Sequence, residues 1–81
     1  MALHEGERGE ALSGRERDVI ELVAEGFTNE EIASKLKISH HTAKFHLTNA
    51  CQKLGARNRA HAAVLFERQK IAAAVDQMAV A

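Results

Sequence analysis

Residues 28–55 read TNEEIASKLKISHHTAKFHLTNACQKLG and contain the signals of two helices joined by a tight turn. Thr28 is followed three positions later by Glu31, which is the pattern of a capping box at a helix start. Ser39 is a second good N-cap residue, and Gly55 can take the left-handed conformation that ends a helix. The stretch therefore predicts a short helix, a tight turn and a longer helix, which together make a helix-turn-helix.

Helix signals also flank this stretch, whereas strand signals are nearly absent. Ser13 and Glu16 form another capping box, Gly26 follows the segment ELVAE, and Asn58 is a good N-cap type. The chain has no proline and no alternating apolar run of the kind that strands show. We therefore predict an all-α protein, a compact four-helix bundle, with helices at 13–25, 29–36, 40–54 and 59 to about 70.

The chain is long enough for one small domain. A domain of 81 residues buries roughly 60–65 % of its unfolded surface. We assign residues 12–70 to this domain. Residues 1–11 show no periodicity and are expected to form a flexible arm. Residues 71–81 are expected to extend the fourth helix, and fraying after Ile71 is the alternative.

The net charge is zero, but the charges are unevenly distributed along the chain. Residues 1–31 carry nine carboxylates and three arginines, whereas residues 32–66 carry six Lys or Arg and no carboxylate. An acid-free block of this length favours an anionic partner, because a carboxylate there would repel it. The alternative is a solvated basic face whose counter-charge comes from the acidic first third of the chain.

The helix predicted at 40–54 has two distinct faces. At 100° per residue, one arc of about 60° predicts the core side and contains Ala43, Leu47, Ala50 and Leu54. A roughly opposite arc of about 100° is polar except for one aromatic and contains His41, Lys44, Phe45, Thr48 and Gln52. Lys can donate to guanine, Gln can pair with adenine, Thr can serve either base, and Phe can pack on a thymine methyl group. We therefore predict contacts to bases in a major groove from Lys44, Phe45, Thr48 and Gln52. For Phe45, a packed surface aromatic is the alternative.

Other side chains suit the phosphate backbone. Hydroxyls and free backbone N–H groups at a helix start attract phosphate, which applies to Ser39, His41 and Thr42. Three cations near the far end of the same helix are also well placed for phosphates: Lys53, Arg57 and Arg59.

A set of residues in register extends over most of the chain. It comprises Leu-Ser-x-Arg-Glu at 12–16, Gly26, Thr28-Asn29, Glu31-Ile32-Ala33, Leu36, Ile38-Ser39, Thr42, Lys44, His46, Lys53-Leu54-Gly55 and Asn58-Arg59. With these residues, positions 12 to about 66 closely resemble the LuxR-type (GerE-type) DNA-binding domain of bacterial transcription regulators. The resemblance implies a four-helix bundle whose third helix reads the major groove and whose fourth helix commonly forms a dimer.

The resemblance also implies roles for individual residues. It implies base contacts from Lys44, Phe45 and Thr48, and backbone contacts from Thr28, Asn29, Ser39, Thr42 and Lys53. The chain departs from the family at Ala43, where Val is usual. Phe45 and Thr48 stand where a smaller aliphatic and a cation are frequent, so the preferred DNA sequence does not transfer. Family members usually carry a receiver or ligand-binding domain ahead of this module. We therefore expect either a stand-alone regulator or a piece of a longer one.

The fourth helix has an apolar side of its own. Val64, Ile71, Val75 and Met78 follow one another at spacings of seven, four and three. Buried apolar area stabilises contact with a partner helix. We predict a homodimer whose interface contains Ala60, Ala63, Val64, Ile71 and Val75. A helix that packs back on its own core is the alternative.

Several other functional classes fit the sequence poorly. Cys51 is expected to be a small buried hydrophobe rather than a redox sensor. The histidines lack the Cys or carboxylate support of a zinc site, and no catalytic motif is present. The chain has neither a signal peptide nor an apolar run of ~20 residues. We therefore expect no enzyme activity, no metal or cofactor, no small-molecule ligand, no membrane partner and a cytoplasmic location.

Taken together, the sequence predicts a transcription regulator that binds double-stranded DNA sequence-specifically as a homodimer. RNA polymerase is a further candidate partner of such a regulator. The alternative function is a protein-interaction adaptor or anti-activator that acts through the fourth helix without binding DNA. The acid-free block argues against this alternative, because an adaptor has no need to exclude carboxylates from this helix.

Overall fold

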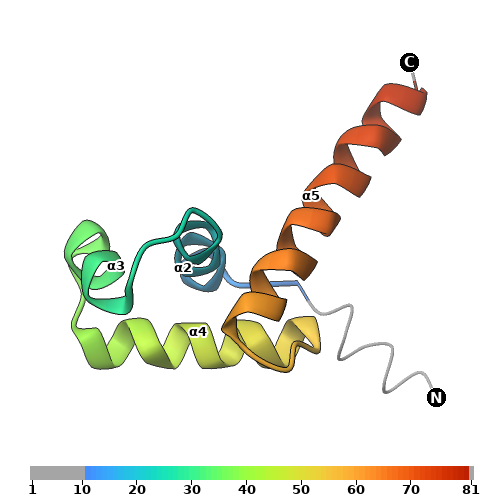
Figure 1. Cartoon of the computed structure of the whole chain (residues 1–81). Coiled ribbons are helices and arrows are strands. Elements are labelled where there is room, and N and C mark those ends of the chain that lie inside the picture. The colour runs from blue at the N-terminus through green and yellow to red at the C-terminus, as the bar shows by residue number, and fades with distance from the viewer. Residues whose placement is uncertain (1–10, 81) are drawn as a thin grey trace.

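Four helices account for most of residues 11–80, the part of the chain that the computed structural model describes. They are α2 (Gly14–Ala24), α3 (Asn29–Leu36), α4 (His40–Leu54) and α5 (Arg59–Val80). Figure 1 shows α2 and α3 lying along one side of α4, while α5 rises from the C-terminal end of α4 and projects away. The described residues contain no strand, so the predicted all-α class is confirmed. The predicted arm at residues 1–11 lies, except for Ala11, outside the described residues.

The helices begin at the predicted caps. The Ser13 hydroxyl accepts a hydrogen bond from the Glu16 backbone at 3.1 Å, and the Glu16 carboxylate accepts one from the Ser13 backbone at 2.9 Å. The same reciprocal pair joins Thr28 and Glu31 at the start of α3. Both capping boxes are therefore confirmed, and each supplies partners for backbone N–H groups that have none within the helix.

Two glycines and one lysine close the helices. Gly26 and Gly55 have φ values of 95° and 71°, as expected for residues that end a helix in the left-handed region. Lys37 ends α3 with a φ of 59°, although it carries a side chain. The turn of the helix-turn-helix therefore contains a lysine in the left-handed region. Because glycine is the usual residue there, the sequence did not predict this conformation.

The core lies where the helices meet. The predicted stripe of α4, which consists of Ala43, Leu47, Ala50 and Leu54, is buried. It packs with buried residues of the other three helices, namely Val19, Ile20, Val23, Ile32, Ala33, Ala62 and Phe66. Phe66 is the largest fully buried side chain, and Ile20 and Ile32 are also fully buried. The core side predicted for α4 is confirmed.

Helix α5 belongs to the core only in its first half. Ala62 and Phe66 are buried, whereas every described side chain from residue 67 to 78 is exposed. The helix nevertheless continues to Val80. The structure thus has one long helix where the sequence predicted a helix to about residue 70 with an extension.

Candidate nucleic-acid interface

The outward face of α4 brings the predicted base-contacting residues together. Lys44, Phe45, Thr48 and Gln52 are all exposed and lie opposite the buried stripe of the same helix. Phe45 has 58 % of its surface exposed, which is unusual for a large apolar side chain. Its ring and the His46 imidazole form an edge-to-face pair, with a centroid distance of 5.6 Å and an interplanar angle of 62°. This contact gives the exposed aromatic a packing partner.

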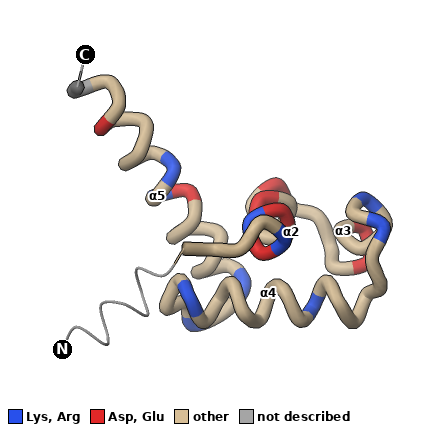
Figure 2. Tube along the Cα trace, turned by 180° about the vertical axis from the view of Figure 1, so that it is seen from behind, with Lys and Arg blue, Asp and Glu red and all other residues tan. Residues whose placement is uncertain are grey.

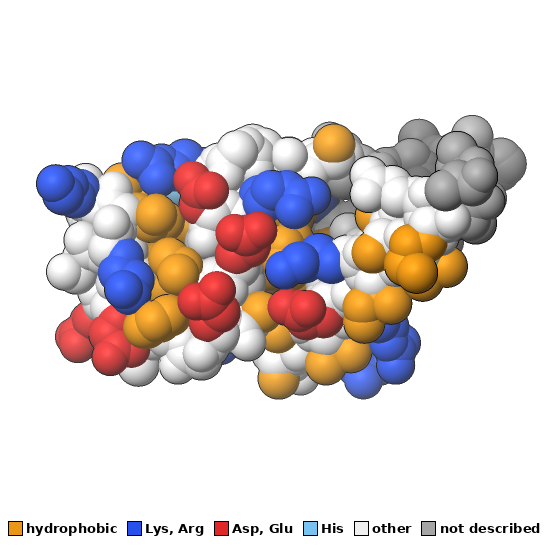
Figure 3. All heavy atoms as spheres, turned by 90° about the horizontal axis from the view of Figure 1, so that it is seen from above, with side chains coloured by type: hydrophobic (Ala, Val, Ile, Leu, Met, Phe, Trp, Pro, Cys, Tyr) orange, Lys and Arg blue, Asp and Glu red, His pale blue; other side chains and the backbone are white. Residues whose placement is uncertain are grey.

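Within residues 11–80, carboxylates are absent from α4 and lie on the other three helices and the α2–α3 loop. Figure 2 shows cations and no carboxylate along α4, whereas carboxylates lie on α2, α3 and α5. Figure 3 shows the face away from α4, where acidic side chains gather over the α2 region among basic and apolar ones. The α4 side therefore carries positive charge alone, whereas the opposite face carries both signs.

The start of α4 holds three of the residues predicted to contact the DNA backbone. The Ser39 hydroxyl accepts a hydrogen bond from the Thr42 backbone at 2.9 Å and lies 2.8 Å from the Thr42 hydroxyl. His41 is exposed beside them. Because the Ser39 hydroxyl takes up the Thr42 N–H, the first-turn backbone donors left without a partner are those of His40 and His41.

The remaining predicted backbone contacts lie at the two ends of the interface. Thr28 is exposed at the start of α3, and Asn29 beside it is half-buried. Arg57 is exposed in the loop between α4 and α5, and its backbone N–H donates to Nδ1 of His61 at 3.0 Å. The imidazole thus holds the loop before α5, while Asn58 caps the helix by accepting a hydrogen bond from the His61 backbone N–H at 2.8 Å.

Lys53 has an intramolecular partner that the sequence did not reveal. Its Nζ lies 2.9 Å from Oε1 of Glu16, a carboxylate that is only 5 % exposed. The pair ties α2 to the C-terminal end of α4. Lys53 was predicted to bind phosphate, but Glu16 balances its charge. For this one cation, the counter-charge comes from the acidic first third of the chain, as the alternative to an anionic partner predicted.

The surroundings of Glu16 shift its ionisation in a definite direction. Burial alone raises the pKa of this carboxyl, but the Ser13 backbone N–H and Lys53 outweigh burial and lower the pKa below its ordinary 4.5. The unfolded chain therefore binds a proton at higher pH than the folded one does. The contribution to stability is complete above pH 4.5 and is lost as the pH falls through the lower folded pKa.

Replacing Glu16 by glutamine tests this pair. At pH 7 we expect Glu16→Gln to lower the free energy of unfolding by about 1–3 kcal/mol, because Lys53 loses its charged partner. Urea unfolding at several pH values should show a smaller loss at pH 3 than at pH 7. Glu31→Gln, in the exposed capping box of α3, is the matched control. An equal loss for Glu16→Gln at both pH values would contradict the role of its charge.

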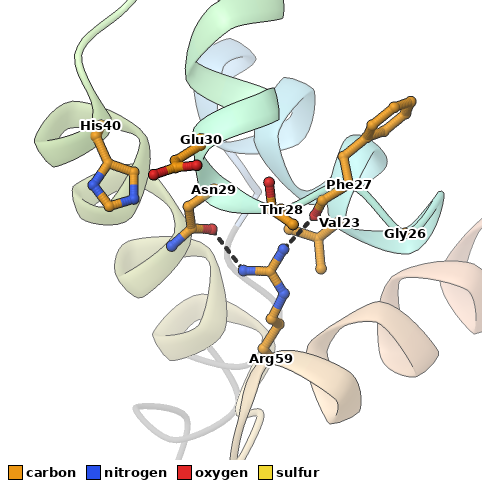
Figure 4. A pocket seen from close by; sticks show the side chains of 8 residues that line it. All are labelled: Val23, Gly26, Phe27, Thr28, Asn29, Glu30, His40 and Arg59. Atoms are coloured by element: carbon orange, nitrogen blue, oxygen red, sulfur yellow. Dashed lines mark hydrogen bonds between the residues drawn. The ribbon is translucent and has the colours of Figure 1, made fainter.

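Arg59 also turns inward instead of facing solvent. Figure 4 shows its guanidinium between the α2–α3 loop and the start of α3, where it donates to Oδ1 of Asn29 at 2.6 Å and to the Phe27 carbonyl. A hollow of about 500 Å³ opens beside it, lined also by Thr28, Glu30 and His40. Arg59 and Asn29 are 30 positions apart, so no local signal in the sequence could have paired them.

The exposed apolar residues of α5 form one stripe. Val64, Ile71, Val75 and Met78 are 47 %, 61 %, 54 % and 74 % exposed, and Ala60 lies on the same side. Ala63 differs from the other predicted interface residues, because it is half-buried and packs against the core. The stripe lies opposite Ala62 and Phe66 on the helix.

Residues 11–80 contain a single cysteine and no cluster of metal-ligating side chains. Cys51 is half-buried against the core, and burial raises the pKa of its thiol despite the nearby charge of Arg59. No three His, Cys, Asp or Glu side chains gather there in a way that could hold a metal ion. Within the same residues, no helix is long and apolar enough to cross a membrane.

The chain matches a known protein family over most of its length. Residues 10–66 match the family described as bacterial regulatory proteins, luxR family. Over 53 residues the chain is 49 % identical to the spore germination protein GerE of Bacillus subtilis, a match that covers 65 % of this chain and 72 % of GerE.

Two longer proteins are similar to the same region. The nitrate/nitrite response regulator protein NarP of Escherichia coli is 44 % identical over 59 residues, and the transcriptional regulatory protein LiaR of B. subtilis is 41 % identical over 71. These matches cover 73 % and 84 % of this chain but only 27 % of NarP and 34 % of LiaR. With its helix-turn-helix and the match over residues 10–66, the chain belongs to the luxR family of bacterial regulatory proteins.

Proposed function

We propose that this chain is a transcription regulator that binds double-stranded DNA with α4 in the major groove. One observation carries the proposal: α4 presents Lys44, Phe45, Thr48 and Gln52 together on an exposed face that is free of carboxylates. A major groove about 12 Å wide admits an α-helix, and these side chains complement base edges and the thymine methyl group. Membership of a family of regulatory proteins supports the same function.

The backbone contacts in this proposal come from both sides of α4. Phosphates at the N-terminal end of α4 would be held by residues at two helix starts. These are Thr28 and Asn29 of α3, and Ser39, His41 and Thr42 of α4. Arg57 and Lys53 would hold phosphates at the other end. Lys53 also pairs with Glu16, so we expect it to contribute less to DNA affinity than a lysine without a carboxylate partner would. We also propose a cytoplasmic location, because the DNA partner lies there, and RNA polymerase as a further candidate partner.

We also propose that two copies pair through the exposed stripe of α5. Large apolar side chains in a continuous stripe are costly to leave in water, and a second copy of the same helix would cover them. Ala63 would lie at the edge of such an interface, since it already packs on the core. A two-fold dimer would place its two α4 helices in successive major grooves, with half-sites about 10 base pairs apart.

Fluorescence anisotropy of a labelled 30-base-pair duplex of random sequence tests DNA binding. We expect binding that weakens steeply between about 50 and 200 mM salt, because phosphate contacts release counterions. Selection from a randomised duplex pool should then yield two half-sites about 10 base pairs apart. Absence of binding at low salt would contradict the proposal and favour an adaptor that acts through α5.

A further inference from the structure

Arg59 links three segments that meet at one end of the proposed DNA interface. It is the first residue of α5, and its two terminal nitrogens reach Asn29 at the start of α3 and the Phe27 carbonyl in the preceding loop. The guanidinium is planar and holds its donors in a fixed fork, so two bonds to two different acceptors fix both acceptors relative to α5. The side chain is half-buried, which protects these bonds from solvent.

The bond from Arg59 determines which way the Asn29 amide faces. Arginine has donors only, so Asn29 must present its oxygen to the guanidinium and turn its nitrogen away. Figure 4 shows this nitrogen pointing away from Arg59. Among residues 11–80, the nitrogen has no protein acceptor, whereas the oxygen accepts from Arg59 at 2.6 Å. Asn29 thus offers two oriented N–H donors to an acceptor outside the protein.

We propose that Arg59 is a positioning residue that aims the Asn29 amide at a DNA phosphate. This role rests on the proposed function, because it explains how Asn29 makes one of the proposed contacts to the DNA backbone. Without the guanidinium, the terminal torsion of Asn29 is broad, and the amide would present oxygen as readily as nitrogen to the phosphate. A phosphate oxygen needs a donor, so a fixed amide binds it with less loss of conformational freedom.

The charges around this position explain why orientation matters more than attraction there. Glu30 lines the same hollow and Glu31 caps the same helix, so the start of α3 does not attract anions by net charge. Two nitrogens of Arg59 are bonded within the protein, and its guanidinium lies on the oxygen side of the Asn29 amide, opposite the free nitrogen. The contact to phosphate therefore runs through the neutral amide.

A double-mutant cycle in duplex binding tests the proposal. The protein carries Arg59→Gln, Asn29→Ala or both, and the dissociation constant for a 30-base-pair duplex is measured by anisotropy at several salt concentrations. We expect Arg59→Gln to weaken binding about five- to tenfold in the wild-type background and to have almost no effect in the Asn29→Ala background. The slope of log affinity against log salt should stay the same, because no phosphate-bound charge is removed.

Other results separate the remaining roles of Arg59. If Arg59→Gln lowered the salt slope by about 1, Arg59 would itself bind a phosphate, and the proposal would be wrong. If it weakened binding equally in both backgrounds with an unchanged slope, Arg59 would act only on the fold. Arg59→Lys keeps the charge but not the fork, so it should bind as weakly as Arg59→Gln.

Two controls keep these outcomes distinct from failure of the proposed function. Arg15→Gln removes the same charge from α2, where Arg15 pairs with Asp18 on its own helix, and it should leave binding within about twofold of wild type. Thermal unfolding of each variant checks that it is folded at the assay temperature. If Arg59→Gln is unfolded, Arg59→Lys replaces it in the cycle. A wild-type protein that does not bind would refute DNA binding itself, whereas binding without the predicted coupling would refute only the role of Arg59.

Discussion

Replacing Phe66 by alanine is expected to lower the free energy of unfolding by about 3–5 kcal/mol. The ring is 1 % exposed and lies on the side of α5 that packs against the rest of the bundle. The Arg17 and Lys70 cations lie 5.3 and 5.5 Å from its centroid, so the substitution also removes two cation–π contacts. A domain of this size has a total stability of about 4–12 kcal/mol, so the variant would lose a large part of it.

Urea unfolding of dilute protein, followed by circular dichroism, measures this loss. Val64→Ala is the matched control, because Val64 lies on the same helix but is 47 % exposed. We expect the control to stay within about 1 kcal/mol of wild type, since an exposed side chain loses little on truncation. Similar losses for both variants would show that the first half of α5 does not hold the bundle together through Phe66.

Reversing the charge of Lys44 is expected to weaken duplex binding by about 100-fold. Lys44 is exposed in the middle of the outward face of α4, where loss of a base contact costs about 1–3 kcal/mol. Glutamate at this position would also repel the phosphates, because Lys44→Glu changes the charge of each subunit by two units. The loss should be larger at low salt than at high salt, because salt screens the repulsion between this glutamate and the phosphates.

A matched reversal elsewhere separates this effect from that of net charge. Lys70→Glu makes the same change on α5, where Lys70 lies over the Phe66 ring beside Arg17 and away from α4. We expect Lys70→Glu to weaken binding much less than Lys44→Glu does, because only screened long-range repulsion acts from that position. Equal losses from the two reversals would mean that DNA does not contact the outward face of α4.

Local signals explain which parts of the fold could be predicted. A capping box such as Ser13 and Glu16 lies within four residues, and Gly55 ends α4 because of its own backbone freedom. The two faces of α4 follow from helical periodicity alone, so its buried stripe and its exposed arc could be assigned before any tertiary contact was known. The family resemblance then predicts that the third helix reads the major groove.

Contacts between distant residues could not be predicted in the same way. The sequence contains Glu16 and Lys53, but nothing in it states that α2 crosses α4 where these two meet. The inward turn of Arg59 toward Asn29 likewise depends on how α5 packs on the bundle. Both cations were expected to face phosphate, and their partners became visible only in the three-dimensional arrangement. Lys37 takes the left-handed conformation without being glycine, and the next residue, Ile38, donates to the Ala33 carbonyl and packs against the core.

Chemical-shift mapping by NMR shows which residues of the protein contact DNA. A short duplex is added at low salt to isotopically labelled protein, and the backbone amide signals of residues 11–80 are followed. The account predicts that the largest changes occur along α4 from His41 to Gln52 and at Thr28 and Asn29, while the second half of α5 changes little. Changes concentrated on α2 or on the exposed end of α5, with α4 unaffected, would contradict it.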